Sequence, residues 1–392
     1  MSLDANFMAA DCLIQVHSDI ASVDASTWND LLDEQAHPTP FMRHEYLNAL
    51  ELSGSAVAES GWLPRHMTLH VNGQLLAACA GYLKSHSYGE YVFDWAWADA
   101  YRRHGLRYYP KHLSAVPFTP VPGTRLMARD GASRVLLAAA LRQDAQQQGL
   151  SSAHVLFIDD GDSQALLQAG WMLREGLQFH WTQDTQQPQA DFADLLSRLQ
   201  RDKRKKIQQD RRRVQEQGIA FSVHEASDIS EELWAFFYHC YTLTYRAHQS
   251  TPYLSRDFFS RMAATMAEHW VMFVARRGDQ AVACSLIAVD RPAGAAWGRY
   301  WGCIEQLPCL HFEACYYQPL AWCLANGLRR FEGGAQGEHK MARGLLPTKT
   351  QSAHWLSDPR FAQAVSDFLG AEGQGVQDYV NELDARSPFK SG

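Results

Sequence analysis

Apolar residues recur along the chain in two similar series, and each series contains a β-hairpin pattern. In the first series two apolar runs flank Asn72-Gly73, a pair that favours the type I′ turn of a tight hairpin. In the second series the runs are separated by the turn sequence Arg277-Gly278-Asp279. The predicted hairpin strands are 67–71 with 74–82, and 271–275 with 281–289. Aromatic runs follow both hairpins, at 91–97 and 297–301, and we expect each to be a strand.

Shorter patterns fill the rest of the two series. Strands are expected where apolar and polar residues alternate over a short run, and helices where apolar residues recur every three or four positions. The further expected strands are 13–16, 124–128, 154–158, 171–175, 177–181 and 220–223. The expected helices are 27–35, 41–53, 132–149, 163–169, 230–246, 255–269 and 361–369.

The stretch 297–343 carries most of the residues suited to chemistry. After the strand at 297–301 it predicts a helix that begins beyond Pro308 and ends at Asn326-Gly327, then a strand at 329–332 and a glycine-rich turn. Pro319 lies inside this helix, so we expect the helix to kink or to start late. Polar residues gather where the strands end, and loops at the ends of rigid strands are where active sites are usually built.

One long polar helix is predicted between the two series. It is capped by Asp191, ends near Gln217 and has a sparse apolar stripe on one face. Its centre is basic: Arg201, Lys203, Arg204, Lys205, Lys206, Arg211, Arg212 and Arg213. A solvated helix face is the common meaning of such a run, and contact with nucleic-acid phosphates is the functional alternative. Because no aromatic residues are interleaved, the helix would hold a backbone rather than read bases.

Length and charge limit the protein class. The chain has 392 residues, more than one hydrophobic core normally holds, so two domains are expected. The net charge of -7 argues against polyanion binding by the molecule as a whole, although one segment can still bind an anion. Neither a secretory signal nor an apolar run long enough to cross a membrane is apparent, and we therefore expect a cytoplasmic protein.

The eight cysteines are scattered and form no CxxC pair, so buried reduced thiols are expected. His311-Phe312-Glu313 has the H-x-E spacing of zinc deaminases, but the P-C-x-x-C half of that motif is missing. The sequence therefore predicts no metal site.

The order of elements resembles a known superfamily. A hairpin, a long strand, a helix and a further strand resemble the middle of the GNAT N-acetyltransferase fold, and two such copies joined by a charged helix resemble the Fem-type transferases of bacterial cell-wall synthesis. More closely, the chain resembles the bacterial FemAB-like, or peptidoglycan-biosynthesis-like, predicted N-acyltransferases. The segments that carry this resemblance are 86–97, 109–111, 117–120, 178–181, 203–207, 298–302, 311–318 and 334–340.

The resemblance implies an α/β (α+β) fold of two tandem GNAT-like domains in a Fem-like arrangement, which agrees with the repetition of the two series. We expect an N-terminal GNAT-like domain at 12–184, a linker with the basic helix at 185–217, a C-terminal GNAT-like domain at 218–370 and a mobile tail at 371–392.

The implied activity is N-acyl transfer of an acyl or aminoacyl group onto a small-molecule amine, in the setting of cell-wall precursor metabolism. The co-substrate would be acyl-CoA or aminoacyl-tRNA, without a tightly bound cofactor. No Q/R-x-x-G-x-G/A pyrophosphate loop precedes the 311–328 helix, which argues against acyl-CoA. The alternative is a non-catalytic binding protein of the same fold that holds RNA or an anionic partner through the 201–213 helix, with Lys203, Arg204, Lys205 and Lys206 as contacts.

In a GNAT-like unit the acyl donor lies where two neighbouring strands splay, and by resemblance these strands are 296–303 and 328–333. Glycines in the turn after the second strand would let a ligand approach the backbone closely, although a simple turn also explains them. The residues expected to bind donor or substrate are Arg299, Tyr300, Trp301, Tyr316, Tyr317, Gln318, Gly334, Gln336, Gly337, Lys340 and Arg343, with Asp94 and Trp95 in the first series.

Acyl transfer also needs a base for the amine proton and donors for the oxyanion. The candidate bases are Glu332, Glu313, Glu338, His311 and His339. A carboxylate in an aromatic pocket has its pKa raised toward neutrality, which suits a base. Glu332 has an alternative role as an internal ion-pair partner of Arg299 or Arg343, and His311 as a helix N-cap or a core histidine. Lys340 and Arg343 suit a phosphate or carboxylate, unless they are solvated loop charges.

Overall fold

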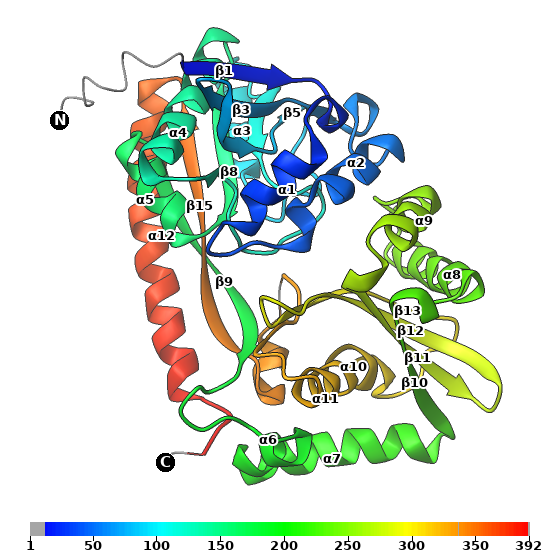
Figure 1. Cartoon of the computed structure of the whole chain (residues 1–392). Helices are drawn as coiled ribbons and strands as arrows, with labels where there is room; N and C mark the ends of the chain where they lie inside the picture. The colour runs from blue at the N-terminus through cyan, green and yellow to red at the C-terminus, as the bar shows by residue number, and fades with distance from the viewer. Residues whose placement is uncertain (1–11, 336, 391–392) are drawn as a thin grey trace. The chain divides into compact units, whose positions relative to one another are not determined.

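The computed structural model describes residues 12–335 and 337–390 of the chain. The chain divides into two compact units. The first unit is Met1–Gly176 with Thr350–Gln377, and the second unit is Leu177–Lys349 with Asp378–Gly392. Strands β9 (Met172–Thr182) and β15 (Leu346–Leu356) each contain a point where the chain passes from one unit to the other. Figure 1 labels the elements of both units.

The first unit contains two groups of strands. A four-stranded antiparallel sheet has the order β1-β3-β4-β7, and a second group has the order β15-β8-β6-β5-β2, in which only β6 and β8 are parallel. The strands are β1 (Cys12–His17), β2 (Trp62–Pro64), β3 (His66–Val71), β4 (Gln74–Cys79), β5 (Tyr82–Lys84), β6 (Lys111–Ser114), β7 (Met127–Ala128) and β8 (Ser152–Ile158).

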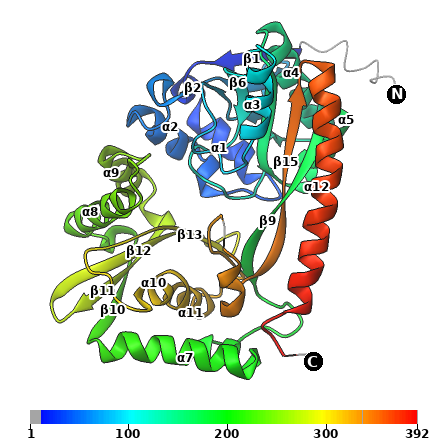
Figure 2. The same ribbon diagram turned by 180° about the vertical axis from the view of Figure 1, so that it is seen from behind.

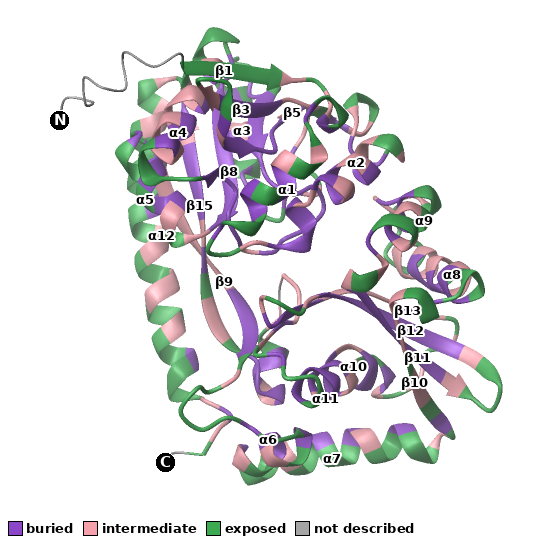
Figure 3. Ribbon diagram, viewed as in Figure 1, coloured by how far each residue is buried: buried purple, intermediate pink, exposed green. Residues whose placement is uncertain are grey.

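The helices of the first unit cover these strands with apolar side chains. Leu137 and Leu141 of α4 pack with Leu69 of β3 and Val155 of β8 in one core cluster, and Figure 3 shows β8 buried along its length. The helices are α1 (Ala25–Asp33), α2 (His44–Leu52), α3 (Trp95–Arg103), α4 (Gly131–Gln147) and α5 (Asp160–Gln168), and α12 (Pro359–Ala385) begins in this unit. Short 3₁₀ segments occupy Ile20–Ser22, Pro40–Met42 and Ala58–Ser60.

The second unit is built on one twisted sheet with the strand order β10-β11-β12-β13-β14-β9. Neighbouring strands are antiparallel except for β13 and β14, which are parallel. A parallel pair needs a crossover connection, and the helical segment between β13 and β14 supplies it. The strands are β10 (Ile219–Glu225), β11 (Trp270–Arg277), β12 (Gln280–Asp290), β13 (Ala295–Cys303) and β14 (Arg330–Glu332).

Helices cover both faces of this sheet. Within the second unit, α8 and α9 lie on one face, and α10, α11 and α7 lie on the other (Figures 1 and 2). The helices are α6 (Phe192–Arg198), α7 (Arg201–Glu216), α8 (Glu231–Ala247), α9 (Arg256–Thr265), α10 (Leu310–Phe312), a π-helical turn (Glu313–Tyr317) and α11 (Gln318–Ala325). Segments of 3₁₀ helix occupy Ala226–Asp228, Ala267–His269 and Glu338–Arg343.

Side-chain alternation along the strands divides the second unit into two faces. Ala296 of β13 and Phe331 of β14 belong to the core cluster that includes Leu320 and Cys323 of α11. The next residue on each strand, Trp297 and Glu332, is therefore expected to point to the α8–α9 face, because successive side chains of a strand lie on opposite sides. None of the helices among the described residues combines the length and apolar content that a membrane span requires.

Most predicted elements are present. Both predicted hairpins form, as β3–β4 and β11–β12. Asn72 and Gly73 have φ of 51° and 78°, the positive values that a type I′ turn requires. The predicted strand, helix and strand of 297–332 correspond to β13, the α10–α11 segment and β14.

Other predictions of secondary structure were wrong. The predicted strand 91–97 does not form: residues 91–94 lie outside any strand, and residues 95–97 begin α3, because Trp97 and Tyr101 are buried on one side of a helical turn. The runs 171–175 and 177–181 form the single strand β9. The long polar helix is two helices, since Leu199 is extended and interrupts it. The last helix continues through the predicted mobile tail to Ala385, and β15 was not predicted.

Candidate functional site

The seam between β13 and β14 is short. The two strands pair at three positions, from Ala295 with Arg330 to Trp297 with Glu332. The pairing ends there, and the next residues, Gly298 and Gly333, line a cavity. A Cβ atom at Gly298 would lie 3.3 Å from the Phe331 ring and 3.4 Å from the Glu332 carbonyl oxygen, so a side chain here would fill this part of the seam and press on the ring.

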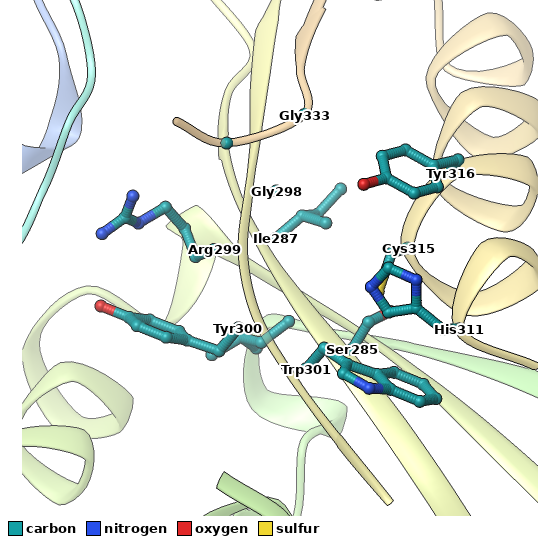
Figure 4. Close-up of a pocket in the computed structure, with 12 residues that line it drawn as sticks. Ser285, Ile287, Gly298, Arg299, Tyr300, Trp301, His311, Cys315, Tyr316 and Gly333 are labelled. Carbon is teal, nitrogen blue, oxygen red and sulfur yellow. The ribbon is translucent and has the colours of Figure 1, made fainter. Parts of the chain in front are cut away.

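A β-bulge shapes the other side of β13. Leu286 of β12 pairs with Tyr300, and the next residue, Ile287, pairs with Gly298, which leaves Arg299 as the extra residue of the bulge. Such a bulge changes the direction in which the following side chains point. Arg299 and Tyr300 point to one side of β13 in Figure 4, away from the residues of the α10–α11 segment.

The cavity at this seam has a volume of about 150 Å³. Its walls come from β12, β13, the helix that follows β13 and the turn after β14 (Figure 4). The lining residues are Ser285, Leu286, Ile287, Gly298, Arg299, Tyr300, Trp301, His311, Cys315, Tyr316, Gly333 and Gly334. The strands predicted to splay around a donor thus both contribute to one concave site.

Tyr300 places a polar atom on the α8–α9 face. Its ring packs at 5.5 Å from the rings of Tyr241 and Phe259, measured between centroids. Its hydroxyl is buried and has no hydrogen-bond partner among the described residues. A buried hydroxyl without a partner is costly, so this atom is available to a ligand in the cavity.

The helical segment opposite is widened by a π turn. Residues Glu313–Tyr317 form this turn immediately before Pro319, which has no backbone N–H to donate to the preceding turn. The predicted late start is not observed, since α10 begins at Leu310, and the disturbance near Pro319 takes the form of this π turn. The segment carries His311, Cys315 and Tyr316 to the cavity wall. In Figure 4 the Tyr316 hydroxyl points from this segment toward the seam.

The turn after β14 is held by a buried lysine. Lys340 donates a hydrogen bond of 2.8 Å from Nζ to the carbonyl oxygen of Gly334, and Gly334 has a φ of 89°. Burial lowers the pKa of Lys340 to about 8. A Cβ atom at Gly333 would lie 3.2 Å from Cδ of Lys340, so the lysine stem lies directly beneath the turn.

Two histidines border the cavity side of the α10–α11 segment. His311 is exposed, but its ring packs against Trp301 and Tyr316, and partial desolvation with the nearby His339, Arg343 and Lys340 lowers its pKa to about 4. His339 lies 3.3 Å from the Tyr316 hydroxyl through Nε2, and burial followed by the charge of Arg343 lowers its pKa. Both rings are therefore neutral near pH 7.

Glu332 lies at the end of β14 and is buried, but it does not line the cavity. Its Oε1 is 3.3 Å from Nε of Arg330, and its Oε2 is 3.8 Å from Nε2 of His180. Glu332 thus forms an ion pair, but with Arg330 and not with the predicted Arg299 or Arg343. The Oε2 atom has no hydrogen-bond partner among the described residues, so it retains an acceptor for a ligand.

Other candidate residues lie in structural networks. Glu313 is buried, accepts hydrogen bonds from Nε of Arg211 on α7 and Nε2 of Gln318, and has its pKa raised by burial. Tyr317 donates from its hydroxyl to Asp210 over 3.2 Å. These contacts attach α7 to the π turn.

The remaining candidates of the second unit lie around the 3₁₀ segment Glu338–Arg343. Glu338 is exposed and accepts a hydrogen bond of 2.7 Å from Tyr379 of α12, away from the cavity lining. The Arg343 guanidinium lies 3.6 Å from the centre of the Phe312 ring and donates to the His339 carbonyl oxygen. Gly337 has a φ of 120°, and Gln336 lies outside the described residues.

Two further groups of predicted contacts are placed elsewhere. Asp94 and Trp95 belong to the first unit. The predicted anion contacts are on α7, where Lys203 pairs with Asp202 and Lys206 with Asp210. These pairs neutralise part of the basic run.

Six lining residues were not among the candidates: Ser285, Leu286, Ile287, Gly298, Cys315 and Gly333. Ser285 donates from Oγ to the Ala314 carbonyl oxygen over 2.5 Å and so joins β12 to the π turn. The sequence signal for Ser285 was a serine inside the apolar run 281–289, because a buried hydroxyl in a central strand needs a hydrogen-bond partner. The cavity position of Cys315 depends on the π turn, which the sequence pattern does not show.

Comparison with known proteins places these features in a family. A family model named FemAB-like, described as peptidoglycan biosynthesis and recognition, matches residues 19–391. The structure of L-PGS from Bacillus licheniformis is similar at a TM-score of 0.53 and 12% identity, over 88% of this chain and 97% of that chain. No curated protein sequence matches the chain.

Two further structures give the same result. The C-terminal domain of a putative lysylphosphatidylglycerol synthetase from Agrobacterium fabrum has a TM-score of 0.53 at 11% identity, over 89% of this chain and 96% of that chain. FemX has a TM-score of 0.53 at 10% identity, over 90% of this chain and 100% of that chain. At these identities the likeness shows the fold, and the predicted mixed α/β fold of the Fem type is confirmed. The FemAB-like family model covers residues 19–391 of the 392, and the protein therefore belongs to the FemAB-like family.

Proposed function

We propose that the protein is an N-acyltransferase that moves an acyl or aminoacyl group onto an amine, with the activated carbonyl bound at the seam of β13 and β14. The observation that carries this proposal is the end of the β13–β14 pairing at Gly298 and Gly333, where the cavity begins. The description of the family as peptidoglycan biosynthesis and recognition supports an acceptor amine on a cell-wall precursor.

The reaction joins the acceptor nitrogen to the donor carbonyl carbon and breaks the bond from that carbon to the thiol sulfur of CoA or the ribose oxygen of tRNA. The nitrogen gives a proton to a base, and the leaving group takes one up. Charge develops on the carbonyl oxygen between these events. Lys340 contacts the Gly333–Gly334 wall of the cavity through its Nζ and Cδ atoms, and we assign to it the stabilisation of that charge.

Two groups are proposed as the base. Glu332 has a buried oxygen without a hydrogen-bond partner among the described residues, on the strand that ends at the seam. His311 lines the cavity and is neutral near pH 7. Replacing the base lowers kcat with little change in KM, because a base acts in the transition state. Comparing Glu332→Gln with His311→Asn therefore identifies which of the two acts.

The donor is proposed to be aminoacyl-tRNA or acyl-CoA. The segment between β13 and α10 contains Pro308 and has no glycine among residues 304–309, so it lacks the backbone cradle that a pyrophosphate group needs at a helix N-terminus. This absence favours aminoacyl-tRNA. Arg201, Lys205, Arg212 and Arg213 are exposed on α7 and would supply phosphate contacts.

The test is transfer by the full chain from radiolabelled alanyl-tRNA or acetyl-CoA to peptidoglycan-precursor peptides with a free amine. Gly298→Val places a side chain in the seam, and we expect it to reduce transfer by at least about a hundredfold with the fold retained. Gly370→Val is the matched control, because a side chain at Gly370 meets open space. Absence of transfer from either donor, or equal transfer by Gly298→Val, would contradict the proposal.

The exposed basic face of α7 supports a second candidate, a binding protein for RNA. Ile207 and Val214 are buried on the opposite face, so the exposed cations share one side of the helix. Replacing Lys203, Arg204, Lys205 and Lys206 together by Gln should weaken tRNA binding and its dependence on salt. Two results together would favour this candidate. The unmodified chain would show no transferase activity, and RNA binding would persist in Glu332→Gln, His311→Asn and Gly298→Val.

A further inference from the structure

The first unit contains a buried charged cluster that the proposed transferase does not use. Lys111 of β6 is fully buried, and its Nζ donates to Ser87 over 2.9 Å, to Glu90 over 2.8 Å and to Asp94. An ammonium group has three protons, so these contacts satisfy Lys111 completely. The Tyr108 hydroxyl adds a hydrogen bond of 2.6 Å to the same Oδ2 atom of Asp94.

The two carboxylates are not satisfied in the same way. Glu90 and Asp94 are only 4% and 3% exposed, and each uses one oxygen for Lys111. The other oxygens, Oε1 of Glu90 and Oδ1 of Asp94, are buried without a hydrogen-bond partner among the described residues. Both carboxylates therefore meet at the Lys111 ammonium, and each keeps one oxygen as an unused acceptor. Leaving a buried acceptor unpaired costs about 1–3 kcal/mol, and more for a charged group.

Aromatic rings flank these carboxylates in the sequence and are exposed. Tyr88, Phe93 and Trp95 are 59%, 52% and 40% exposed, although large aromatic side chains are normally buried. The rings of Tyr88 and Trp95 are 5.0 Å apart between centroids and meet edge to face. The segment between β5 and α3 thus combines buried acceptor atoms with exposed rings.

The charges of the cluster favour a cationic ligand. Lys111 balances Asp94, and burial raises the pKa of Glu90 to about 7, so a bound cation would favour the ionised form of Glu90. Lys84 lies over the Trp62 ring and donates to the Tyr88 carbonyl oxygen over 3.3 Å, and burial lowers its pKa to about 7, which reduces its positive charge. His154 and the adjacent His354 have lowered pKa values because both are buried, so they stay neutral. No group of three or more metal-ligating side chains occurs among the described residues, which disfavours a metal ion.

We propose that the first unit has a second ligand site, in which Glu90 and Asp94 bind the ammonium group of a primary amine and Tyr88 and Trp95 hold its apolar part. The carboxylate oxygens accept hydrogen bonds from the ammonium, and the ring faces attract the same charge. All four residues belong to the first unit, whereas the residues that line the proposed transferase cavity belong to the second unit.

Benzylamine is the probe, and benzyl alcohol is the neutral control of nearly the same shape. Titration calorimetry with the full chain should show saturable binding of benzylamine at millimolar concentration and at least about tenfold weaker binding of benzyl alcohol. Glu90→Gln should weaken benzylamine binding by about tenfold or more. Trp95→Ala should weaken it several-fold, and because Trp95 is exposed this variant keeps the fold even if Glu90→Gln does not. His311→Ala, in the second unit, should leave binding unchanged.

Three results would overturn this site: no saturable binding of benzylamine, equal binding of both probes, or unchanged binding in Trp95→Ala. A loss in His311→Ala equal to that in Trp95→Ala would also do so, since it would place the amine in the other unit. The site would also be overturned if a crystal soaked with benzylamine showed ordered water, and no amine, bound to both carboxylate oxygens.

Discussion

At the scale of single residues, the contacts of each buried charged side chain indicate whether it has a proposed role in catalysis or a role in stability. Lys340 and Glu313 are both buried in the second unit, and both were candidate site residues. Lys340 holds the Gly334 carbonyl oxygen at the cavity wall, whereas Glu313 connects Arg211 and Gln318 on the far side of the π turn. In the proposed function the first contact bears on the reaction, and the second contact attaches α7 to the π turn.

Replacing Lys340 by Met should reduce transfer by about a hundredfold, the effect of removing one oxyanion donor. Because the charged form is required and the pKa is lowered to about 8, the transfer rate of the unmodified chain should fall as pH rises above 8. The folded pKa lies below the ordinary value near 10.5, so the unfolded chain holds this proton more tightly, and the free energy of unfolding should rise between pH 8 and 10.5.

The pH profiles of the rate and of urea denaturation, measured on Lys340→Met and the unmodified chain, check this prediction. Lys349→Met is the control, because Lys349 is exposed on β15. A fall in rate above pH 8 that persists in Lys340→Met would assign that titration to another group.

Glu313→Gln should lower stability without removing the chemistry. The change leaves the Arg211 guanidinium without its carboxylate, and we expect the free energy of unfolding to fall by about 1–3 kcal/mol. Transfer per folded molecule should be unchanged, as measured by activity at a temperature well below the melting transition. Glu338→Gln, at an exposed position, should change neither quantity. A large loss of kcat in Glu313→Gln at constant stability would return Glu313 to the list of bases.

At the scale of elements, local sequence predicts a structure when short-range geometry determines it. The Asn72-Gly73 hairpin was predicted because two adjacent residues supply both positive φ values. The π turn at 313–317 was not, since Pro319 shows only that the helix is disturbed and tertiary packing decides how. The start of α3 was also missed, because Trp95 and Trp97 fit an alternating strand as well as a helix until the burial of Tyr101 is known.

The contact between α8 and β13 depends on one glycine. A Cβ atom at Gly302 would lie 2.3 Å from the carbonyl oxygen of Cys240, a backbone atom that cannot rotate away. Gly302→Ala should therefore force the helix from the sheet and lower the free energy of unfolding by about 1–3 kcal/mol or more. Gly131→Ala is the control, because a Cβ there meets open space within α4 and should be neutral or stabilising. Thermal unfolding of both variants measures this effect. An unchanged melting temperature of Gly302→Ala would show that α8 can shift on β13 without cost.

At the scale of the whole molecule, the resemblance to the GNAT fold placed the two strands at the seam, and half of the residues that line the cavity were candidates. The strands that line it, with Tyr300, His311 and Tyr316, were predicted because strand, helix and strand follow one another within one stretch. Contacts between distant segments were not predictable. Arg211 pairs with Glu313 across 102 positions, and β15 pairs with β8 across almost half of the chain. Neither pairing leaves a periodic trace in the sequence.

The first unit is completed by residues from the other end of the chain, and this gives the last prediction. The segment Thr350–Gln377 supplies Gln351–Leu356 of β15, which pairs with β8, and Val365 and Leu369 of α12, which pack with Trp97. A chain ended at Lys349 keeps residues 12–176 but exposes the edge of β8 and this apolar cluster. We expect its first unit to be protease-sensitive, with cleavage between 12 and 176, because a buried strand without its neighbour loses a full ladder of hydrogen bonds.

A chain ended at Ala385 is the control for that truncation, since it keeps β15 and all of α12 and should resist the protease in the first unit. Limited proteolysis followed by mass spectrometry of the fragments separates the two outcomes. If the chain ended at Lys349 protects residues 12–176 as well as the longer chain does, the first unit folds from its own continuous segment, and the returning strand and helix are additions to a core that is already stable.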